Sequence, residues 1–478
     1  MKINKMHREK ELIKNTFIIS LGKICTQLIT FFLLPLYTTI LSTSEYGIFE
    51  LLNTLVSLLL PVVSFQLEQS VFRNLVDNRD NDKEKTKTIT TGSIVLMLQV
   101  IIFILIFLVL SLFVDNEYKF YLLFNVIIYV FSSFSLQLVR GLGNNIKFSF
   151  AGFISALVTI ICNIIFLLLF KTGVIGMFFS LFIGQLVCIL YCIFAMKIYK
   201  FIKFDHFDRK LLCQMYKYSI PLIPNAISWW VFNASDKLIV SIMLGVSQNG
   251  ILSASYKFAG VYITIYNIFN IAWTECVIKH IDESDIDTFL NKTLNSLFKI
   301  FSSFGIIIIA VMPIVYPIMI NSNFIDGYNH VPIMIVGSMF NILIGLISAV
   351  YVAKKATKSI ALTSTIAAII NVSINLLLIN KLGLYAASLS TLISFAAMSL
   401  FRIIDIRKKY FKINIDYKQI IYLFIMLTFI LFIYYSNNLL LQIFGILISV
   451  IYAIVINVKN VIYFYEMFIV KKKKKNYI

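Results

Sequence analysis

Long stretches of apolar residues, separated by short polar connections, run through the whole sequence. A helix that crosses a membrane needs about 20 apolar residues, whereas the strands of a membrane barrel alternate in polarity over about ten. The stretches are continuous and of helical length, so they predict an all-α polytopic membrane protein with about 14 transmembrane helices. They lie at roughly residues 15–40, 47–70, 90–114, 119–140, 148–170, 173–196, 216–244, 250–278, 293–320, 330–352, 359–380, 383–404, 418–436 and 438–458.

The composition excludes a soluble globular protein. Of the 478 residues, 59% are hydrophobic and only 14% are charged, against roughly 45–50% apolar residues in soluble domains. The six cysteines form no Cys-x-x-Cys pair and the four histidines are scattered. We therefore expect no metal site, no disulfide framework and no cofactor.

The positive charges indicate how the chain enters the membrane. Lysine and arginine concentrate in the connections on the cytoplasmic side, and with the N-terminus inside, 36 of the 42 fall there. Lys119, Lys171 and Lys381 fall outside, and the last three, Lys23, Lys237 and Lys257, lie within the apolar stretches, so we expect both termini in the cytoplasm. The net charge of +19 then reflects this topology and attraction to anionic lipid headgroups, and no nucleic-acid partner is expected.

The chain repeats itself after six helices. Residues 41–49 match residues 244–252 at Leu, Ser, Gly and Ile with an offset of 203, and an offset of 210 pairs Gly173 with Gly383. Because an even number of helices separates the copies, both halves enter the membrane in the same direction, as in many transporters that bind substrate between parallel repeats. We expect two parallel six-helix bundles at 1–200 and 201–412, then two extra transmembrane helices and a basic cytoplasmic tail at 413–478.

Polar residues inside the apolar stretches recur at helical spacing. A charge within a membrane usually faces a cavity or another charge, and a spacing of three or four places residues on one face of a helix. The second stretch carries Glu50, Thr54 and Ser57 on one face. The offset of 203 makes Lys257, in the eighth stretch, the equivalent of Thr54. The other positions that we single out are Lys23 and Gln27 in the first stretch, Asn233, Asp236 and Lys237 in the seventh, and Asn267 and Glu275 in the eighth.

These positions also have structural explanations. A single serine, threonine or asparagine in a membrane helix more often hydrogen-bonds a neighbouring helix. Lys23 lies too deep to reach the interface easily, which favours a cavity. Asp236 and Lys237 fit a structural ion pair or a helix cap as well as a cavity. Glu68 and Glu275 lie near the cytoplasmic ends of their helices, which favours a solvated position over a proton site.

Four segments of the sequence, residues 35–49, 218–224, 236–237 and 250–257, resemble a known family in their order and spacing. They are similar to the polysaccharide transporter family of lipid-linked oligosaccharide flippases, which includes O-antigen and capsule repeat-unit flippases. This family lies within the superfamily of the multidrug and toxin extruders. The sequence departs from the family at residues 273–275, where Trp-Thr-Glu stands in place of Trp-x-Pro, so the expected kink lacks its proline.

The resemblance implies a protein of the bacterial cytoplasmic membrane that is not an enzyme. It implies export of undecaprenyl-diphosphate-linked oligosaccharide repeat units by alternating access, with membrane lipids, a polysaccharide polymerase and chain-length machinery as partners. A diphosphate accepts charged hydrogen bonds from lysine, so we assign Lys23, Lys257 and Lys237 to the diphosphate or acidic sugars. We assign the glycan to Gln27, Asn233 and Asn267, and a coupling proton to Glu50, Asp236 or Glu275.

Three other functions stay open. A multidrug extruder of the same fold would carry cations and would need acidic residues in its cavity, whereas the mid-depth charge here is Lys23. A membrane glycan polymerase would need a large extracytoplasmic loop with catalytic residues, and the longest outside connection is about residues 321–329. A scaffold or receptor without transport is disfavoured by the paired polar stripes.

Overall fold

The computed structural model describes residues 30–411, 413–414, 416–436 and 438–458, except for the side chain of Asn233. Every regular element in this part of the chain is a helix, and twelve helices are long and apolar enough to cross a membrane. A shorter apolar helix, Thr30–Ile40, and the 22-residue helix α10 (Leu222–Met243) occupy the first and seventh predicted stretches. The all-α polytopic fold is therefore confirmed.

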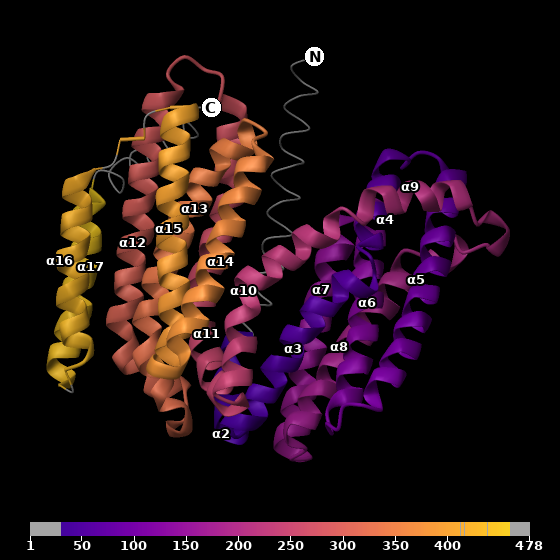
Figure 1. Cartoon of the computed structure of the whole chain (residues 1–478), viewed down its shortest axis with the longest axis horizontal. Coiled ribbons are helices and arrows are strands. Elements are labelled where there is room, and N and C mark those ends of the chain that lie inside the picture. The colour runs from indigo at the N-terminus through magenta and orange to yellow at the C-terminus, as the bar shows by residue number, and fades with distance from the viewer. Residues whose placement is uncertain (1–29, 412, 415, 437, 459–478) are drawn as a thin grey trace, which may run out of the picture. The chain divides into compact units, whose positions relative to one another are not determined.

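The chain divides into two compact units, Met1–Ser253 and Ala254–Ile478. The first unit holds α2 (Leu34–Ile40), α3 (Thr43–Val63), α4 (Leu67–Asp77), α5 (Asp82–Ser111), α6 (Lys119–Gly141), α7 (Asn145–Ile164), α8 (Gly173–Ala195), α9 (Arg209–Ser219), α10 and the first turns of α11 (Val246–His280), as labelled in Figure 1. The second holds the rest of α11, then α12 (Ile286–Met319), the 3-10 helix η4 (Ser322–His330), α13 (Val331–Ala353), α14 (Thr357–Leu382), α15 (Leu384–Lys409), α16 (Tyr417–Tyr434) and α17 (Leu439–Ile456). The domain boundaries predicted after residues 200 and 412 stay a prediction.

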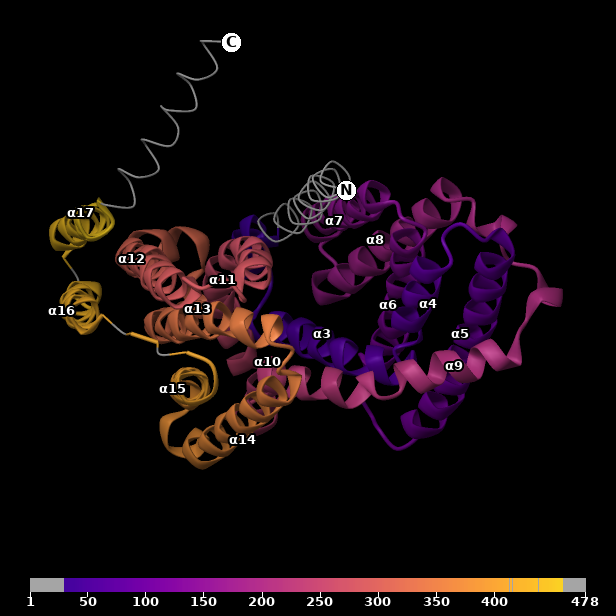
Figure 2. The ribbon, with the colours of Figure 1, turned by 90° about the horizontal axis from the view of Figure 1, so that it is seen from above.

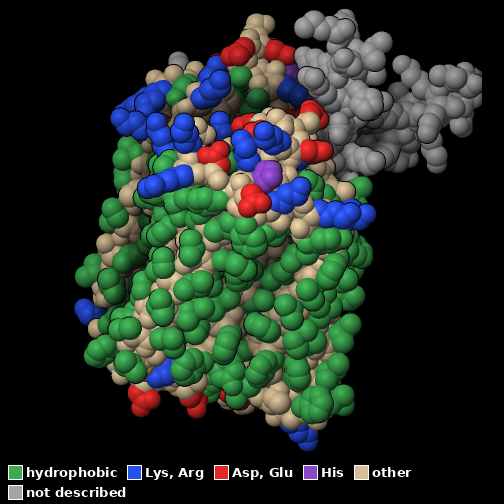
Figure 3. All heavy atoms as spheres, turned by 90° about the vertical axis from the view of Figure 1, so that its right-hand side faces the viewer, with side chains coloured by type: hydrophobic (Ala, Val, Ile, Leu, Met, Phe, Trp, Pro, Cys, Tyr) green, Lys and Arg blue, Asp and Glu red, His purple; other side chains and the backbone are tan. Residues whose placement is uncertain are grey.

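Helices of the first unit pack closely inside and present apolar side chains outside. Val71 on α4 and Phe134 on α6 meet at Gly92 on α5, where an added Cβ would lie 2.7 Å from the Val71 side chain. On the outer side of α5, Ile102 and Leu105 are more than half exposed. Figure 3 shows apolar side chains covering the middle of one face, with lysine and arginine gathered mainly at one end. This distribution is that of a membrane-embedded surface.

The second predicted stretch, residues 47–70, is not one helix. α3 ends at Val63, and Phe65 and Gln66 adopt left-handed conformations with φ of 48° and 54° before α4 begins. We call residues 64–66 the elbow. Polar residues gather at the elbow and just after it, with Ser64, Gln66, Glu68 and Gln69 between residues 64 and 69, a signal that the single predicted stretch did not use.

The predicted solvated position of Glu68 is wrong. This residue, in the first turn of α4, is 1% exposed. It shares a helix face with Val71 and Leu75, which pack against Gly92 of α5 and Gly141 of α6. The amphipathic helix α4 therefore turns the face that carries Glu68 toward its neighbours, and its position near a helix end does not bring it into solvent.

The seventh predicted stretch, residues 216–244, also divides. α9 ends at Ser219 and α10 begins at Leu222, with Pro221 at its N-cap. Proline has no backbone N–H with which to continue the hydrogen bonds of α9, but it suits the start of the next helix.

The internal repeat appears in the helix boundaries. α3 begins at Thr43 and α11 at Val246, which is the pair that the offset of 203 predicts. Gly173 and Gly383, the pair predicted by the offset of 210, both have positive φ, 58° and 56°, at the starts of α8 and α15. Glycine adopts this conformation without the steric cost that a side chain adds.

The two copies of the repeated motif touch each other within the first unit. A Cβ at Gly47 would lie 1.8 Å from a backbone oxygen of α11, and one at Gly250 would lie 2.1 Å from the Thr43 oxygen. The hydroxyls of Thr43 and Ser247 are 2.7 Å apart, and Asn249 Nδ2 donates to the Gly47 carbonyl at 3.0 Å. Only glycine leaves room for two helices at this distance.

The two C-terminal helices, α16 and α17, pack against α12 in the second unit. Figure 2 shows them on the same side of this unit as α12. The Tyr328 and Tyr434 hydroxyls donate to each other's backbone carbonyls at 2.9 and 2.7 Å, and their rings stack at 4.3 Å. Asn457 Nδ2 donates to the Ser303 hydroxyl at 3.0 Å. These bonds hold the C-terminal end of α16, at Tyr434, and the C-terminal end of α17, at Asn457.

Candidate functional site

A buried ion pair joins α3 to α10 in the first unit. Lys237 Nζ lies 2.7 Å from Glu50 Oε2, and the Tyr46 hydroxyl donates to Glu50 Oε1 at 3.2 Å. The Glu50 side chain is 7% exposed and that of Lys237 is 21% exposed. Both oxygens of the carboxylate are therefore bonded, while about a fifth of the lysine side chain is exposed.

Local structure fixes the two helices that carry this pair. α3 starts with a capping box, in which the Ser42 hydroxyl accepts from the Glu45 N–H and the Glu45 carboxylate accepts from the Ser42 N–H. On α10, Trp230 lies seven residues before Lys237 on the same face. Trp230 Nε1 donates to the Thr54 carbonyl at 2.9 Å and to the Ser57 hydroxyl at 3.0 Å, so it sets the register of α10 on α3.

The polar network continues from the pair to α2 and α7. The rings of Tyr46 and Tyr37 stack at 6.3 Å, and Asn163 Nδ2 on α7 donates to the Tyr37 hydroxyl at 2.8 Å. All three side chains belong to buried residues. Four helices of the first unit thus contribute to one network with the Glu50 carboxylate at its centre.

The arrangement allows an exchange of partners. Moving a charge out of water costs several kcal/mol, so each charge of a buried pair needs the other. A proton on Glu50 would leave the Lys237 ammonium available to an anion, and an anion on Lys237 would make protonation of Glu50 easier. Replacement of the Glu50 carboxylate by another anion on Lys237 is therefore chemically possible.

The remaining predicted site residues lie on α10 and α11 or outside the described residues. Lys23, Gln27 and the side chain of Asn233 lie outside the described residues. Asp236 is buried on α10, Lys257 is half-buried on α11, and Asn267 is exposed there. Glu275 lies 2.8 Å from Lys279, one turn along α11, in a partly exposed ion pair. The binding and coupling roles of these residues stay predictions.

A buried arginine in the second unit was not singled out from the sequence. Arg402 on α15 is 2% exposed. Its Nε and Nη2 donate to the hydroxyls of Thr363 and Ser364 on α14 at 3.1 Å, and its Nη1 donates to the Ser348 hydroxyl on α13. The guanidinium therefore ties three helices together. Its position two residues inside the predicted stretch 383–404 was the available signal, because arginine at that depth needs partners.

Replacing Arg402 by lysine is expected to lower the free energy of unfolding by about 2 kcal/mol or more. The charge is kept, but a compact ammonium cannot reach hydroxyls on two helices with the fixed fork of a guanidinium. Unfolding of the purified protein in detergent would measure the change. Arg407→Lys, at an exposed position of the same helix, serves as the control and should change stability by less than about 0.5 kcal/mol; equal losses would contradict this account.

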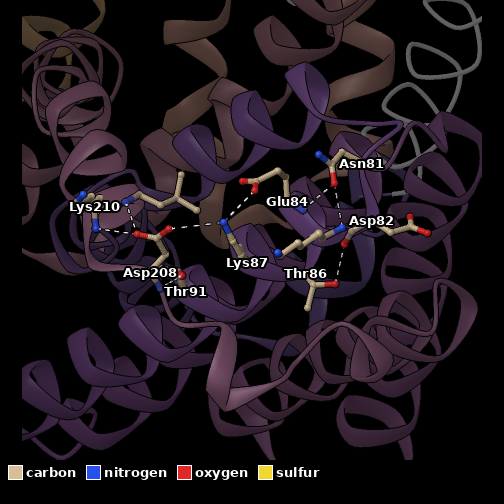
Figure 4. A network of polar contacts seen from close by, with 10 residues as sticks. Asn81, Asp82, Glu84, Thr86, Lys87, Thr91, Asp208 and Lys210 are labelled. Carbon is tan, nitrogen blue, oxygen red and sulfur yellow. Dashed lines mark hydrogen bonds and ion pairs between the residues drawn. The ribbon is translucent and has the colours of Figure 1, made fainter.

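A second network, made of ion pairs and hydrogen bonds, links the connection between α8 and α9 to the start of α5 (Figure 4). Lys87 Nζ lies 2.9 Å from Glu84 Oε1 and 3.9 Å from Asp208 Oδ2, and the Asp208 N–H donates to the Thr91 hydroxyl at 3.0 Å. The Asp208 carboxylate caps α9. The N–H of Leu211 donates to it and contributes most to holding the pKa of Asp208 below its usual range. This network is an anchor for the connection and not a part of the site around Glu50.

Within the described part of the chain, no group of His, Cys, Asp and Glu side chains is arranged to hold a metal ion. Two solved structures with similar folds are distant in sequence. The lipid II flippase MurJ in an inward closed conformation is 17% identical with a TM-score of 0.69, over 96% of this chain and 100% of MurJ. An inward-facing multidrug resistance MATE family transporter is 12% identical with a TM-score of 0.68, over 80% of this chain and 94% of that one.

The family of the protein is identified from its amino-acid sequence. No curated protein sequence matches the chain significantly. Residues 12–274, more than half of the chain, match the family described as polysaccharide biosynthesis protein. The chain therefore belongs to the polysaccharide biosynthesis protein family and has the fold of the MATE transporters and of MurJ.

Proposed function

We propose that this protein is a flippase that moves undecaprenyl-diphosphate-linked oligosaccharide repeat units across the bacterial cytoplasmic membrane by alternating access. The observation that carries the proposal is the Glu50–Lys237 pair, a lysine held inside a membrane-spanning unit by a carboxylate that a proton can neutralise. Membership of the polysaccharide biosynthesis protein family supports a sugar-bearing substrate. The fold that the chain shares with the lipid II flippase MurJ supports a lipid-linked cargo.

In this proposal the diphosphate of the substrate takes the place of Glu50 on Lys237. The substrate must lose water as it enters a low-dielectric path, and charged hydrogen bonds from lysine offset part of that cost. Protonation of Glu50 accompanies binding, so Glu50 is the first candidate for the coupling proton, with Asp236 and Glu275 as the others. The remaining proposed substrate contacts are Lys23, Gln27, Asn233, Lys257 and Asn267.

We further propose that the contact between the two repeated motifs opens and closes during transport. Gly47 and Gly250 allow a close approach, and the Thr43 and Ser247 hydroxyls bridge it. The described polar contacts of this crossing are the Thr43–Ser247 hydroxyl pair and the hydrogen bond from Asn249 to the Gly47 carbonyl, and such interhelical bonds contribute about 0.6 kcal/mol each. Such a contact can separate at moderate cost, as a gate requires. A polysaccharide polymerase and chain-length machinery would act on the delivered repeat units as partners.

The function is tested by the sidedness of the lipid-linked oligosaccharide. Membrane vesicles of known orientation are prepared from cells depleted of the protein and treated with a glycan-cleaving enzyme. We expect the undecaprenyl-linked oligosaccharide to accumulate on the cytoplasmic face. The wild-type protein and the Lys279→Gln variant should restore export, whereas Lys237→Gln should not. Lys279 is a matched control because it also pairs with a glutamate, Glu275, but is 40% exposed.

Two outcomes would contradict the proposed flippase and favour another function. Repeat units that reach the outer face but stay unpolymerised would indicate a polymerase. Unchanged sidedness together with altered resistance to cationic drugs would indicate a multidrug extruder.

A further inference from the structure

Glu68 is a carboxyl group enclosed in the first unit without a charged partner. The residue is 1% exposed, and its Oε2 has no hydrogen-bond partner in the structure. No ion pair joins Glu68 to any residue that the structure describes. A charged carboxylate in such a place lacks both water and a counter-charge, unlike Glu50 with Lys237.

The backbone next to Glu68 is strained. Phe65 and Gln66, the last two residues of the elbow, both have left-handed φ, which is unfavourable for residues with a side chain. The Gln66 N–H donates to the Ser64 hydroxyl at 3.2 Å, which helps to hold the turn. Phe65 is 42% exposed, so the surface of the protein lies within one helical turn of the buried carboxyl.

The helices that pack on α4 carry charged and titratable groups that are engaged elsewhere. On α5, Lys87 pairs with Glu84 and Asp208. On α6, Arg140 lies over the Phe72 ring at 4.6 Å. On α9, the Tyr216 hydroxyl accepts from Gln99 at 3.0 Å. On α4 itself, Arg73 lies 3.9 Å from Asp77 and over the ring of Tyr218 on α9.

The other ionisable groups on the described parts of these helices form no hydrogen bond or ion pair with Glu68 either. Asp82, Lys83 and Lys85 stand at the start of α5 and Lys119 at the start of α6, while Tyr121 and Tyr129 follow on α6. Arg209, Lys210, Cys213 and Lys217 are exposed on α9. None of the hydrogen bonds or ion pairs of these side chains involves Glu68. Burial is the largest influence and raises the pKa of Glu68, while its own backbone N–H and the Ser64 hydroxyl lower it by less.

We propose that Glu68 holds a proton in this conformation and that loss of this proton opens the elbow between α3 and α4. The O–H bond of the carboxylic acid breaks, the proton passes to water that enters beside Phe65, and the carboxylate draws that water into contact. The elbow, whose backbone is already strained, is the segment that changes conformation. Glu68 is thereby a proton-binding group separate from the Glu50–Lys237 pair, and its role does not depend on what the protein transports.

The direction of the pH effect follows from the raised pKa. The closed elbow is favoured fully below the ordinary pKa of glutamate, where Glu68 is protonated in both conformations. As the pH rises, the open form releases its proton first, so the closed form loses stability until the pH passes the raised pKa of the enclosed group. Between these limits, the ratio of open to closed elbow should increase by up to about tenfold per pH unit.

The first measurement is the infrared spectrum of the full chain in lipid at neutral pH. We expect a band from a protonated carboxylic acid in the wild-type protein, lost in Glu68→Gln and kept in Asp77→Asn. Asp77 is a matched control because it lies on the same helix and is exposed. A wild-type spectrum without such a band at neutral pH would overturn the proposal, and this outcome needs no variant to fold.

The second measurement is hydrogen exchange of the backbone amides of residues 64–68 as a function of pH. The wild-type rate is divided by the rate of Glu68→Gln at the same pH, which removes the intrinsic pH dependence of exchange. We expect this ratio to rise with pH and then level off, and the Asp77→Asn protein to behave as the wild type. A ratio that stays constant, or that changes with sodium concentration instead of pH, would contradict proton binding by Glu68.

Discussion

A protein with Thr43→Cys and Ser247→Cys is expected to lose nearly all transport when the two cysteines are oxidised, and to regain it on reduction. The hydroxyls of these residues are 2.7 Å apart, at a crossing where Gly47 and Gly250 bring the backbones together, so the geometry suits a disulfide. A covalent bond prevents the repeated motifs from separating. Transport, measured by the sidedness of lipid-linked oligosaccharide, should fall to roughly a tenth or less, set by the fraction left unoxidised.

The control is a disulfide at a contact that should not move. Ser303 and Asn457 hold α17 against α12 within the second unit, with 3.0 Å between their polar atoms. Oxidation of Ser303→Cys with Asn457→Cys is expected to leave transport unchanged. If the pair at 43 and 247 forms its disulfide in full yield and transport continues at the wild-type rate, the contact between the motifs is not a gate.

The helices could be predicted because each carries its own signal. A continuous apolar stretch of helical length needs no tertiary information to be recognised, and the offset of 203 found in the sequence also relates the observed starts of α3 and α11 at Thr43 and Val246. The elbow could not be predicted in this way. Ser64 and Gln66 interrupt the apolar stretch, but the left-handed backbone of Phe65 and Gln66 carries no sequence signal of its own, because neither residue is a glycine.

The two residues of the Glu50–Lys237 ion pair could be singled out from the sequence, but the contact between them could not. Glu50 and Lys237 each stand out as a charge inside an apolar stretch. They are separated by 187 residues, however, and nothing in the sequence says that α3 lies against α10. Glu68 was placed in solvent because it lies near a helix end, and its burial depends on which face α4 presents to its neighbours. Arg402 was missed for the same reason, since its partners lie on two other helices.

Replacing Glu50 by glutamine is expected to lower the free energy of unfolding by about 3 kcal/mol. The amide keeps the shape of the side chain but leaves the Lys237 ammonium without its counter-charge in a largely enclosed position. Adding Lys237→Gln should recover part of this loss, because the second change removes the unpaired charge. The double variant should therefore be less destabilised than the sum of the two single variants, by about 1–2 kcal/mol. Unfolding of the four proteins in detergent measures this coupling.

Glu275→Gln is the matched control for the same change of charge. Glu275 lies 2.8 Å from Lys279, a distance almost equal to that of the Glu50–Lys237 pair, but its side chain and that of Lys279 are 25% and 40% exposed. Because water screens such a pair, its removal should change stability by less than about 1 kcal/mol. If the two glutamine variants lose equal stability, or if the Glu50 and Lys237 changes are simply additive, the two charges do not depend on each other. Proton-coupled exchange of partners at Glu50 would then have no physical basis.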